Sequence, residues 1–316
     1  MNWTAVRLEA TKYIAPLQHN CPRYLDEIRG VAAGAEVDFV DIVVLNVRTE
    51  IAFGLFTEQP NLQVKLDGCT SLGYRAPTGQ SFLAQNWDWQ VEQTPNLFVC
   101  HISQPGIRAP DFSMVTEGGV IGKIGLNANG VGVALNAIRA RGVDPSKLPI
   151  HLALRAALES TSRQAAIDSL KATGVAGSAH ILVADETGST GLECTSIGIK
   201  ELEMDDDGII VHANHLLLDH ADVDEPPWLR DSPGRVSRLQ DLLQRNVVAS
   251  SSTSVQTLFT LFTDEEGYPG AINRCQKGES ETQTLFTIIM DLGKKSALVS
   301  FGRPTEQVEQ IELSFN

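Results

Sequence analysis

The chain has 316 residues, of which 42% are hydrophobic and 20% are charged, as is typical of a globular protein with an ample core. Its formal net charge of −14 argues against nucleic acid or an anionic membrane as the main partner, because both require a basic surface. No run of about 18 apolar residues could span a bilayer, and the first residues lack the layout of a signal peptide. We therefore expect a cytoplasmic protein.

The five cysteines stand far apart, at positions 21, 69, 100, 194 and 275. Because none belongs to a CxxC pair, the sequence predicts neither a zinc site nor a redox motif. An odd number of cysteines in an intracellular chain favours free thiols over disulfides. Most of these side chains are expected to be small buried hydrophobic residues.

The first sixty residues are predicted to be helical. Pro22 suits the first turn of a helix, and Tyr24 and Ile28 follow it at helical spacing. Asp38 is placed to cap a second helix. Three linker-like stretches are short enough to be surface loops within one domain, and they cover residues 57–65, 141–148 and 219–233.

Beyond Cys69 the pattern changes to strands. The Asn129-Gly130 pair between two apolar runs predicts a β-hairpin, and these glycines open a strand rather than a helix, which disfavours a dinucleotide-binding loop. Helices are predicted at 149–160, 163–172, 234–245 and 255–263, and strands at 180–184, 191–194, 209–213, 284–290, 296–301 and 310–315. This order of elements predicts an α+β fold in which two antiparallel sheets lie between helical layers.

Cys69 follows Gly68 at the junction between the helical opening and the first strand. A glycine leaves the preceding peptide carbonyl accessible. A thiol at this place could attack that carbonyl, take the acyl group onto sulfur and release a new N-terminal cysteine. The freed α-amine, with an ordinary pKa of about 7.7–8.0, could then activate its own thiol. Gly-Cys is a common dipeptide, so the pattern by itself is weak evidence.

Two polar clusters have alternative interpretations. Asn86 and Asp88 lie between tryptophans and could form the floor of a site or a turn with aromatic packing. His212 and His215 could bind a metal, but a strand would place them on opposite faces, so structural histidines are expected. A histidine partner for the Cys69 thiol remains an alternative. Asn214, between the histidines, could donate a hydrogen bond to an oxyanion.

Eight segments, in this order along the chain, resemble the acyl-coenzyme A:isopenicillin N acyltransferase family, in the choloylglycine-hydrolase-like branch of the N-terminal-nucleophile hydrolases. The resemblance covers nearly the whole chain from Pro22 onward. The segments are YLDEIRG at 24–30, LNVRTE at 45–50, DGCT at 67–70, QNWD at 85–88, TEGGVIGK at 116–123, ALESTS at 157–162, HANH at 212–215 and FGRP at 301–304.

The resemblance implies a four-layer αββα sandwich, with residues 1–316 as one domain. It also implies cleavage between Gly68 and Cys69 into an α-chain, 1–68, and a β-chain, 69–316, that stay together. Cys69 would be both the self-cleaving and the catalytic nucleophile. Three further residues match family positions: Asp88 the aspartate that orients the new amine or binds substrate, Asn214 the side-chain oxyanion donor, and Asn136 the residue whose backbone N–H completes the oxyanion hole.

The implied reaction passes an acyl group from an amide or an acyl-coenzyme A co-substrate to Cys69 and then to an amine or water, with no cofactor. Ser280 matches a serine of the family. Glu281 stands where the penicillin-forming enzyme has an arginine, which reverses a charge. Arg274 lies near enough in sequence to be a substitute. We therefore expect a different amine in another secondary-metabolite pathway, and Glu281 points to a cationic one. The alternative is a homologue that has lost catalysis and serves in binding or structure.

Overall fold

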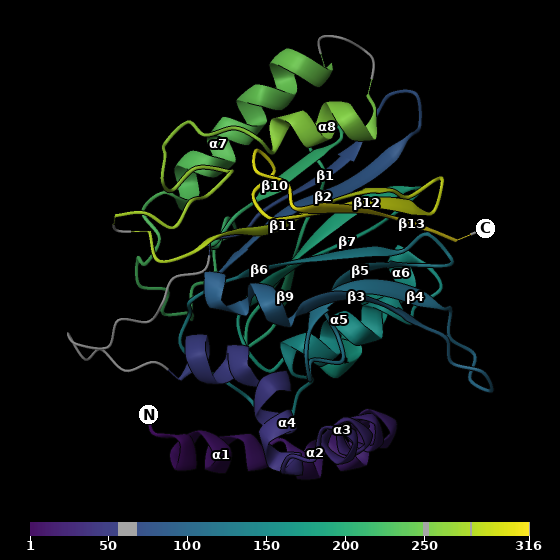
Figure 1. Cartoon of the computed structure of the whole chain (residues 1–316), viewed down its shortest axis with the longest axis vertical. Coiled ribbons are helices and arrows are strands. Elements are labelled where there is room, and N and C mark those ends of the chain that lie inside the picture. Colours follow the sequence, from purple (N-terminus) through teal and green to yellow (C-terminus); the bar gives the residue numbers. More distant parts are fainter. Residues whose placement is uncertain (56–67, 249–252, 279, 316) are drawn as a thin grey trace.

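The structure, a computed structural model, describes residues 1–55, 68–248, 253–278 and 280–315. Two antiparallel sheets face each other, and helices cover the outer face of each (Figure 1). The predicted α+β sandwich of two antiparallel sheets between helical layers is confirmed. The predicted loop at 57–65 lies outside the described residues.

The first sheet has the strand order β10-β1-β2-β11-β12-β13, and the second has the order β3-β4-β5-β6-β7-β8-β9. In the first sheet the bounds are β1 Thr70–Arg75, β2 Ser81–Trp89, β10 Ile209–His212, β11 Gln283–Asp291, β12 Ser296–Phe301 and β13 Glu309–Ser314. In the second they are β3 Leu97–Ile102, β4 Phe112–Glu117, β5 Ile124–Asn127, β6 Gly132–Ala137, β7 Ala179–Asp185, β8 Gly188–Cys194 and β9 Ile199–Leu202.

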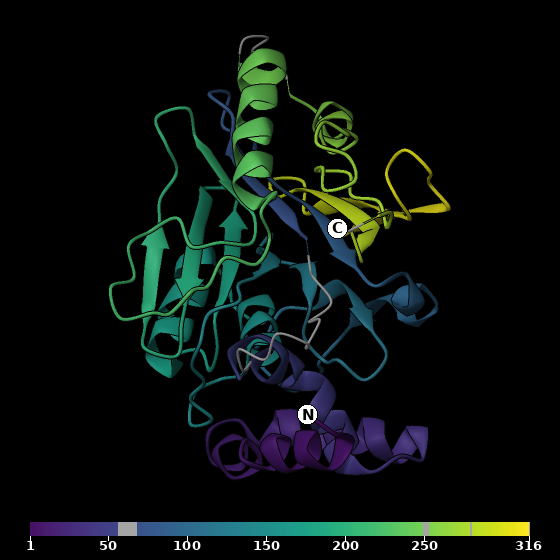
Figure 2. The same cartoon turned by 90° about the vertical axis from the view of Figure 1, so that its left-hand side faces the viewer.

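The helices form three groups, which Figures 1 and 2 show from two sides. An N-terminal group contains α1 Trp3–Thr11, α2 Ile14–Asn20, α3 Pro22–Ala35, α4 Phe39–Asn46 and a short π-helix, η1 Glu50–Gly54. The helices α5 Ile150–Leu158 and α6 Arg163–Thr173 pack on the second sheet, whereas α7 Ser232–Leu243 and α8 Val255–Leu261 pack on the first. Two further short helices are the 3₁₀-helix η2 Val91–Asn96 and the π-helix η3 Gln244–Val248.

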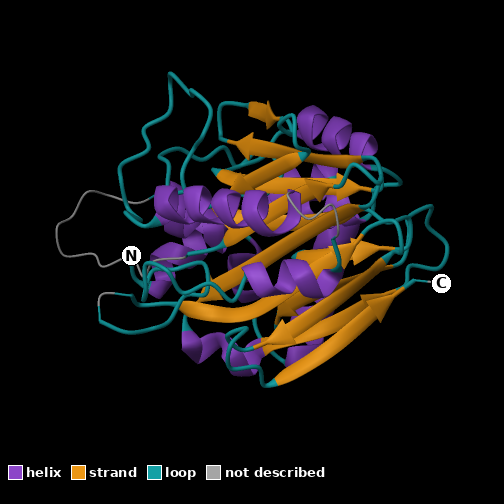
Figure 3. Ribbon diagram, turned by 90° about the horizontal axis from the view of Figure 1, so that it is seen from above, coloured by secondary structure: helices purple, strands orange, loops and turns teal. Residues whose placement is uncertain are grey.

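Seen from above, helices overlie the strands of the sandwich (Figure 3). The first sheet is covered on one face by the second sheet and on the other by α7 and α8, and both faces carry apolar side chains. Alternate residues of β2 illustrate this: Leu83 and Trp87 join the core between the sheets, and Phe82 and Ala84 join the core under α7 and α8. Burial on both sides explains why β2 is buried at every position except its last.

The predicted helix cap, first-turn proline and hairpin turn are present in the structure. The Asp38 side chain accepts a hydrogen bond from the Val40 N–H at the start of α4, at 2.8 Å, and Pro22 occupies the first turn of α3. Gly130, in the hairpin turn between β5 and β6, has a φ of +86°, a conformation that favours glycine. All five cysteines have free thiols, as expected. In the described part of the chain, no helix has the length and apolar character needed to cross a bilayer.

Glu50 joins the N-terminal helices to the second-sheet layer. Its side chain is fully buried, and its Oε1 accepts a hydrogen bond of 2.6 Å from the Ile150 N–H, at the positive end of the α5 dipole. Burial disfavours the carboxylate and raises the pKa of Glu50 to about 7. The folded protein therefore holds this proton at pH values where the unfolded chain has released it.

This pKa predicts a pH dependence of stability. Between about pH 4.3, the ordinary glutamate pKa, and pH 7 the folded state binds more protons than the unfolded state. The free energy of unfolding should then fall as pH rises through this window, by on the order of 1–3 kcal/mol. Glu50→Gln keeps the acceptor for Ile150 but cannot ionise, so the variant should lack this slope. Urea unfolding of both proteins at pH 5 and pH 8 measures it; equal slopes would contradict the assignment.

Candidate active site

Cys69 lies immediately before β1, fully buried. Its Sγ is 3.9 Å from the backbone oxygen of Asp88. Its own carbonyl oxygen accepts two hydrogen bonds, one from Asn136 Nδ2 at 3.1 Å and one from Arg235 Nη1 at 2.7 Å. The main chain at Cys69 is therefore held both by Asn136 of the second sheet and by Arg235 of helix α7.

Asn136 reaches Cys69 from β6, across the space between the two sheets. Its Oδ1 accepts a hydrogen bond from Ser71 Oγ at 2.6 Å and lies 3.0 Å from His180 Nδ1. Because these contacts occupy the oxygen, the Asn136 amino group is the part that faces the Cys69 carbonyl. The asparagine side chain is thus fixed in one orientation.

Asn214 follows β10 and is also fully buried. Its Oδ1 accepts a hydrogen bond from Arg235 Nη2 at 2.9 Å, and its Nδ2 donates one to the Ala137 carbonyl at 3.0 Å. Ala137 directly follows Asn136 in β6, so the two asparagines lie close together. The Asn214 N–H donates to Ser232 Oγ at 2.7 Å, which ties the Asn214 main chain to the start of α7.

Asp88 and Arg274 form a second group beside the junction. Asp88 Oδ1 accepts a hydrogen bond of 2.7 Å from Thr284 Oγ1, and Asp88 Oδ2 lies 3.4 Å from Arg274 Nε. Arg274 Nη1 donates to Ser280 Oγ at 3.2 Å. A Cβ placed on Gly68 would lie 2.1 Å from Arg274 Nε. Arg274 therefore packs directly on the peptide unit that precedes Cys69, and position 68 has room for glycine alone.

Asp231 connects the two groups. Its Oδ2 accepts hydrogen bonds from Arg235 Nε, at 2.7 Å, and from Arg274 Nη2. Burial opposes ionisation of Asp231, but the two guanidinium groups outweigh burial and lower the pKa of this carboxyl. One carboxylate thus holds two arginines, and these arginines contact Asn214 on one side and Asp88 on the other.

The structure brings together seven of the eight site residues predicted from the sequence. Cys69, Asn136 and Asn214 form one group, and Gly68, Asp88, Arg274 and Ser280 adjoin it through the contacts above. Glu281 is half-buried and follows Ser280 in the chain. Its pairing with a substrate stays a prediction.

Two residues that the sequence analysis missed, Asp231 and Arg235, join these groups. Their only sequence signal was an acid and a base four residues apart at the start of a predicted helix. Such a spacing is typical of an exposed ion pair, and nothing in it reveals that Arg235 points inward.

The histidines have structural partners, as expected. His212 Nδ1 lies 3.0 Å from the Ala213 carbonyl, and His212 Nε2 lies 2.9 Å from Glu193 Oε1. His215 Nδ1 lies 2.7 Å from Ser232 Oγ. Both nitrogens of His212 therefore have partners other than the Cys69 thiol. Among the described residues, no group of three histidine, cysteine or acidic side chains could hold a metal ion.

A cavity of about 150 Å³ has walls next to two of the candidate site residues, Asp88 and Asn136. Trp87, next to Asp88, and Ala137, next to Asn136, are among its walls. Phe53 contributes an aromatic wall and packs on Trp228, with ring centroids 5.4 Å apart, and the Trp228 indole N–H donates to the Asn214 carbonyl at 2.9 Å. The remaining lining residues are Arg48, Thr49, Ala52, Trp89, Lys123, Leu135 and His151. This largely apolar chamber can accommodate a small acyl group.

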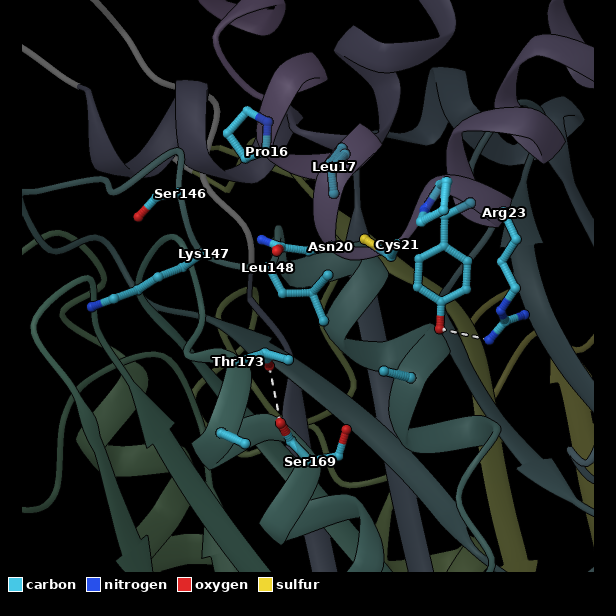
Figure 4. Close-up of a pocket in the computed structure, with 14 residues that line it drawn as sticks. Pro16, Leu17, Asn20, Cys21, Arg23, Ser146, Lys147, Leu148, Ser169 and Thr173 are labelled. Atoms are coloured by element: carbon cyan, nitrogen blue, oxygen red, sulfur yellow. Dashed lines mark hydrogen bonds between the residues drawn. The ribbon is translucent and has the colours of Figure 1, made fainter.

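A larger cavity, of about 600 Å³, lies between the N-terminal helices and α5 and α6. Figure 4 shows Leu17 and Cys21 on one side of it and Leu148 and Thr173 on the other. Among the described residues, Asp88, Asn136 and Arg235, which contact Cys69, and Ala137 and Ser232, which contact Asn214, do not line this cavity. Size alone would favour it as a binding site, but the smaller cavity has the chemistry beside it, so we take the smaller one as part of the candidate active site.

Comparison with solved structures shows a fold shared with two hydrolases. A conjugated bile acid hydrolase from Clostridium perfringens superposes with a TM-score of 0.54 and 14% identity, over 78% of this chain and 92% of that one. A Caenorhabditis elegans orthologue of N-acylethanolamine-hydrolyzing acid amidase superposes with a TM-score of 0.52 and 15% identity, over 71% and 93%. The fold is therefore that of the N-terminal-nucleophile hydrolases.

Comparison of sequences is more specific. The family model for acyl-coenzyme A:6-aminopenicillanic acid acyl-transferase matches residues 75–306. The chain is also 39% identical, over 303 residues, to the acyl-coenzyme A:6-aminopenicillanic-acid-acyltransferase 40 kDa form of Emericella nidulans, a match that covers 95% of this chain and 81% of that protein. The chain belongs to the acyl-coenzyme A:6-aminopenicillanic acid acyl-transferase family.

Proposed function

We propose that the chain is a self-processing cysteine acyltransferase or amidohydrolase that forms or cleaves an amide through a thioester on Cys69. The observation that supports this most is a single buried side chain, Arg235, that contacts both the Cys69 carbonyl and the Asn214 carboxamide, at 2.7 and 2.9 Å. A nucleophile and an oxyanion donor are the two parts that acyl transfer requires. In this protein one side chain, Arg235, contacts both the nucleophile residue and the oxyanion donor.

In the processing step, Cys69 Sγ attacks the Gly68 carbonyl carbon and the bond from that carbon to the Cys69 nitrogen breaks. The thiol proton moves to this nitrogen, which becomes a free α-amine, and water then hydrolyses the thioester to leave a carboxylate on Gly68. The two chains would be residues 1–68 and 69–316. Contacts between the N-terminal helices and the remainder, such as Glu50 with Ile150 and Arg155 with Glu27, support a pair that stays associated after cleavage.

In the catalytic cycle, the Cys69 α-amine accepts the thiol proton as Sγ attacks the acyl donor. The tetrahedral oxyanion takes hydrogen bonds from Asn214 Nδ2 and from the backbone N–H at Asn136. The leaving amine or thiol takes the proton from the ammonium group, and the thioester remains. An amine acceptor or water then attacks this thioester by the reverse sequence. Asp88 orients the amine of Cys69, and Arg274 holds the Asp88 carboxyl group in place.

The cavity beside Trp87 and Ala137 suggests the acyl group. A mostly apolar chamber of about 150 Å³ suits a short chain or a single ring, and the donor would be an amide or an acyl-coenzyme A thioester. The acceptor differs from that of the penicillin-forming enzymes, because Glu281 favours a cationic amine over an anionic one. We place the enzyme in another secondary-metabolite pathway, and its five free thiols support a reducing compartment such as the cytoplasm.

Trapping the acyl-enzyme tests this function. The processed protein is mixed with a short-chain acyl-coenzyme A, quenched in acid and digested, and the peptides are mapped by mass. The expected result is one acyl group on the peptide that begins at Cys69, removed by hydroxylamine as a thioester would be. An unmodified Cys69, or acyl groups spread over the other four cysteines, would contradict the proposal and favour a homologue that binds without catalysis.

Gly68→Ala should slow processing. The added methyl group would collide with Arg274, whose guanidinium is held by Asp88, Asp231 and Ser280 and cannot move without breaking those contacts. We expect the half-time of cleavage to lengthen by about 10-fold or more, since a displacement of about 1 Å near a reacting group costs up to 10²-fold. Gel electrophoresis of the precursor over time measures it.

Gly34→Ala is the matched control, because the Cβ it adds meets nothing within 4 Å. It should be cleaved at the wild-type rate. A Gly68→Ala precursor that is cleaved as fast as the control would mean that Arg274 does not restrict this position during processing.

A further inference from the structure

We propose that Arg235 is a positioning residue that fixes which end of the Asn214 carboxamide faces the reacting oxygen and holds the Cys69 main chain beside it. This inference rests on the proposed function. Arg235 acts through Asn214 and the Cys69 main chain and does not touch the reacting atoms.

Arg235 enters the site from the first turn of α7, with its side chain 2% exposed. Three of its nitrogens have separate partners. Nη1 donates to the Cys69 carbonyl at 2.7 Å and to Thr70 Oγ1 at 2.8 Å, Nη2 donates to Asn214 Oδ1 at 2.9 Å, and Nε donates to Asp231 Oδ2 at 2.7 Å. The guanidinium plane therefore connects the nucleophile, the oxyanion donor and an anchoring carboxylate.

The orientation of Asn214 follows from the chemistry of its neighbours. A guanidinium group donates hydrogen bonds and accepts none, so the atom of Asn214 that faces Arg235 is the oxygen. The Ala137 carbonyl accepts and cannot donate, so the atom facing it is the nitrogen. The two contacts agree, and they leave the second N–H of Nδ2 for the oxyanion. An Asn214 turned by 180° would place two acceptors against each other and an oxygen toward the oxyanion.

Lysine cannot reproduce this arrangement. Its ammonium group is a single point of charge, whereas the planar arginine fork spans two acceptors in a fixed geometry. A lysine at 235 could bind Asp231 or Asn214, but it could not hold Asn214 Oδ1 and the Cys69 carbonyl together. Arg235→Lys therefore keeps the buried positive charge and removes the positioning.

The experiment is a double-variant cycle on the processed full-length protein, with kcat and KM measured per mole of cleaved enzyme. Arg235→Lys should lower kcat by about 10²-fold with little change in KM, as expected when a catalytic group is misplaced. Asn214→Ala should lower kcat by about 10²–10³-fold. In the Asn214→Ala background, Arg235→Lys should cost less than about 10-fold more, because the group that it positions is already gone.

Arg238→Lys is the matched control. Arg238 lies on the same helix, is half-buried and pairs with Asp264 and Glu266. Its replacement should leave kcat unchanged. A further 10²-fold loss on adding Arg235→Lys to Asn214→Ala would overturn the proposal, since a purely structural role acts independently of Asn214. So would an Arg235→Lys variant as active as Arg238→Lys. A wild-type protein with no turnover and no acyl-enzyme would instead refute the proposed function.

If Arg235→Lys does not fold, Asp231→Asn provides a second route, because Asp231 is partly exposed, with 29% of its side chain accessible. It loosens the anchor at Arg235 Nε and should lower kcat by about 10-fold. Most of that loss should disappear in the Asn214→Ala background. An equal loss in both backgrounds would overturn the proposal.

Discussion

Cys69→Ala is expected to abolish acyl turnover, with kcat reduced on the order of 10⁴-fold or more, because removal of a nucleophile eliminates the covalent intermediate. Processing has to be separated from turnover, since the same thiol is proposed for both. Co-expressing residues 1–68 with residues 69–316, the latter behind a cleavable tag that leaves residue 69 as the first residue, bypasses self-cleavage. Turnover of an amide or acyl-coenzyme A is then measured with and without the substitution.

Cys194→Ala is the control for a general effect of losing a thiol. Cys194 is fully buried in β8, and burial raises the pKa of its thiol above the ordinary range, so it is no candidate for a nucleophile. Its replacement should leave turnover in place. Pre-cleaved protein that carries Cys69→Ala and still turns over substrate would mean that another group forms the acyl-enzyme.

Arg155→Met is expected to lower the free energy of unfolding by about 3 kcal/mol, since removing one partner of a buried ion pair leaves uncompensated charge. The Arg155 side chain is 1% exposed and donates to Glu27 in α3 at 2.8 and 2.9 Å. It also binds Glu159 at 2.8 Å and the Ile121 carbonyl at 2.9 Å. These bonds join the N-terminal helices to α5, so this group of helices should loosen first.

Urea unfolding measures this loss, and Arg245→Met is its matched control. Arg245 pairs with Asp241 in an exposed i,i+4 arrangement, with 70% of its side chain accessible. Exposed pairs of this kind contribute about 0.3–0.5 kcal/mol. Equal effects of the two substitutions would contradict the view that Arg155 stabilises the contact between the N-terminal helices and α5.

Local signals predicted the fold because they depend on neighbours in sequence. Asp38 caps α4 through an N–H two residues away, and Asn129-Gly130 makes a turn whose geometry is set within that dipeptide. The alternation of apolar groups along β2 and β11 is likewise a property of the strand itself. The predicted boundaries of α6 and β12 agree with the structure within one residue.

The site could be predicted only in part, because its contacts join distant segments. Asn136 reaches the Cys69 carbonyl over 67 positions, and Arg235 reaches it over 166. The family resemblance predicted Cys69 and Asn136 as site residues, but Arg235 belonged to none of the segments that carried the resemblance. An arginine at helical spacing from an aspartate is usually a surface pair. The sequence held no indication that this face of α7 packs on β1 and β10.

The most direct test is the mass of the purified wild-type protein under denaturing conditions, beside that of Cys69→Ala. We expect two wild-type masses that correspond to residues 1–68 and 69–316, and a variant that remains one chain of about 34.3 kDa. A wild-type protein that stays whole after long incubation would contradict self-processing at Gly68-Cys69, because Cys69 would then have no free amine to activate its thiol.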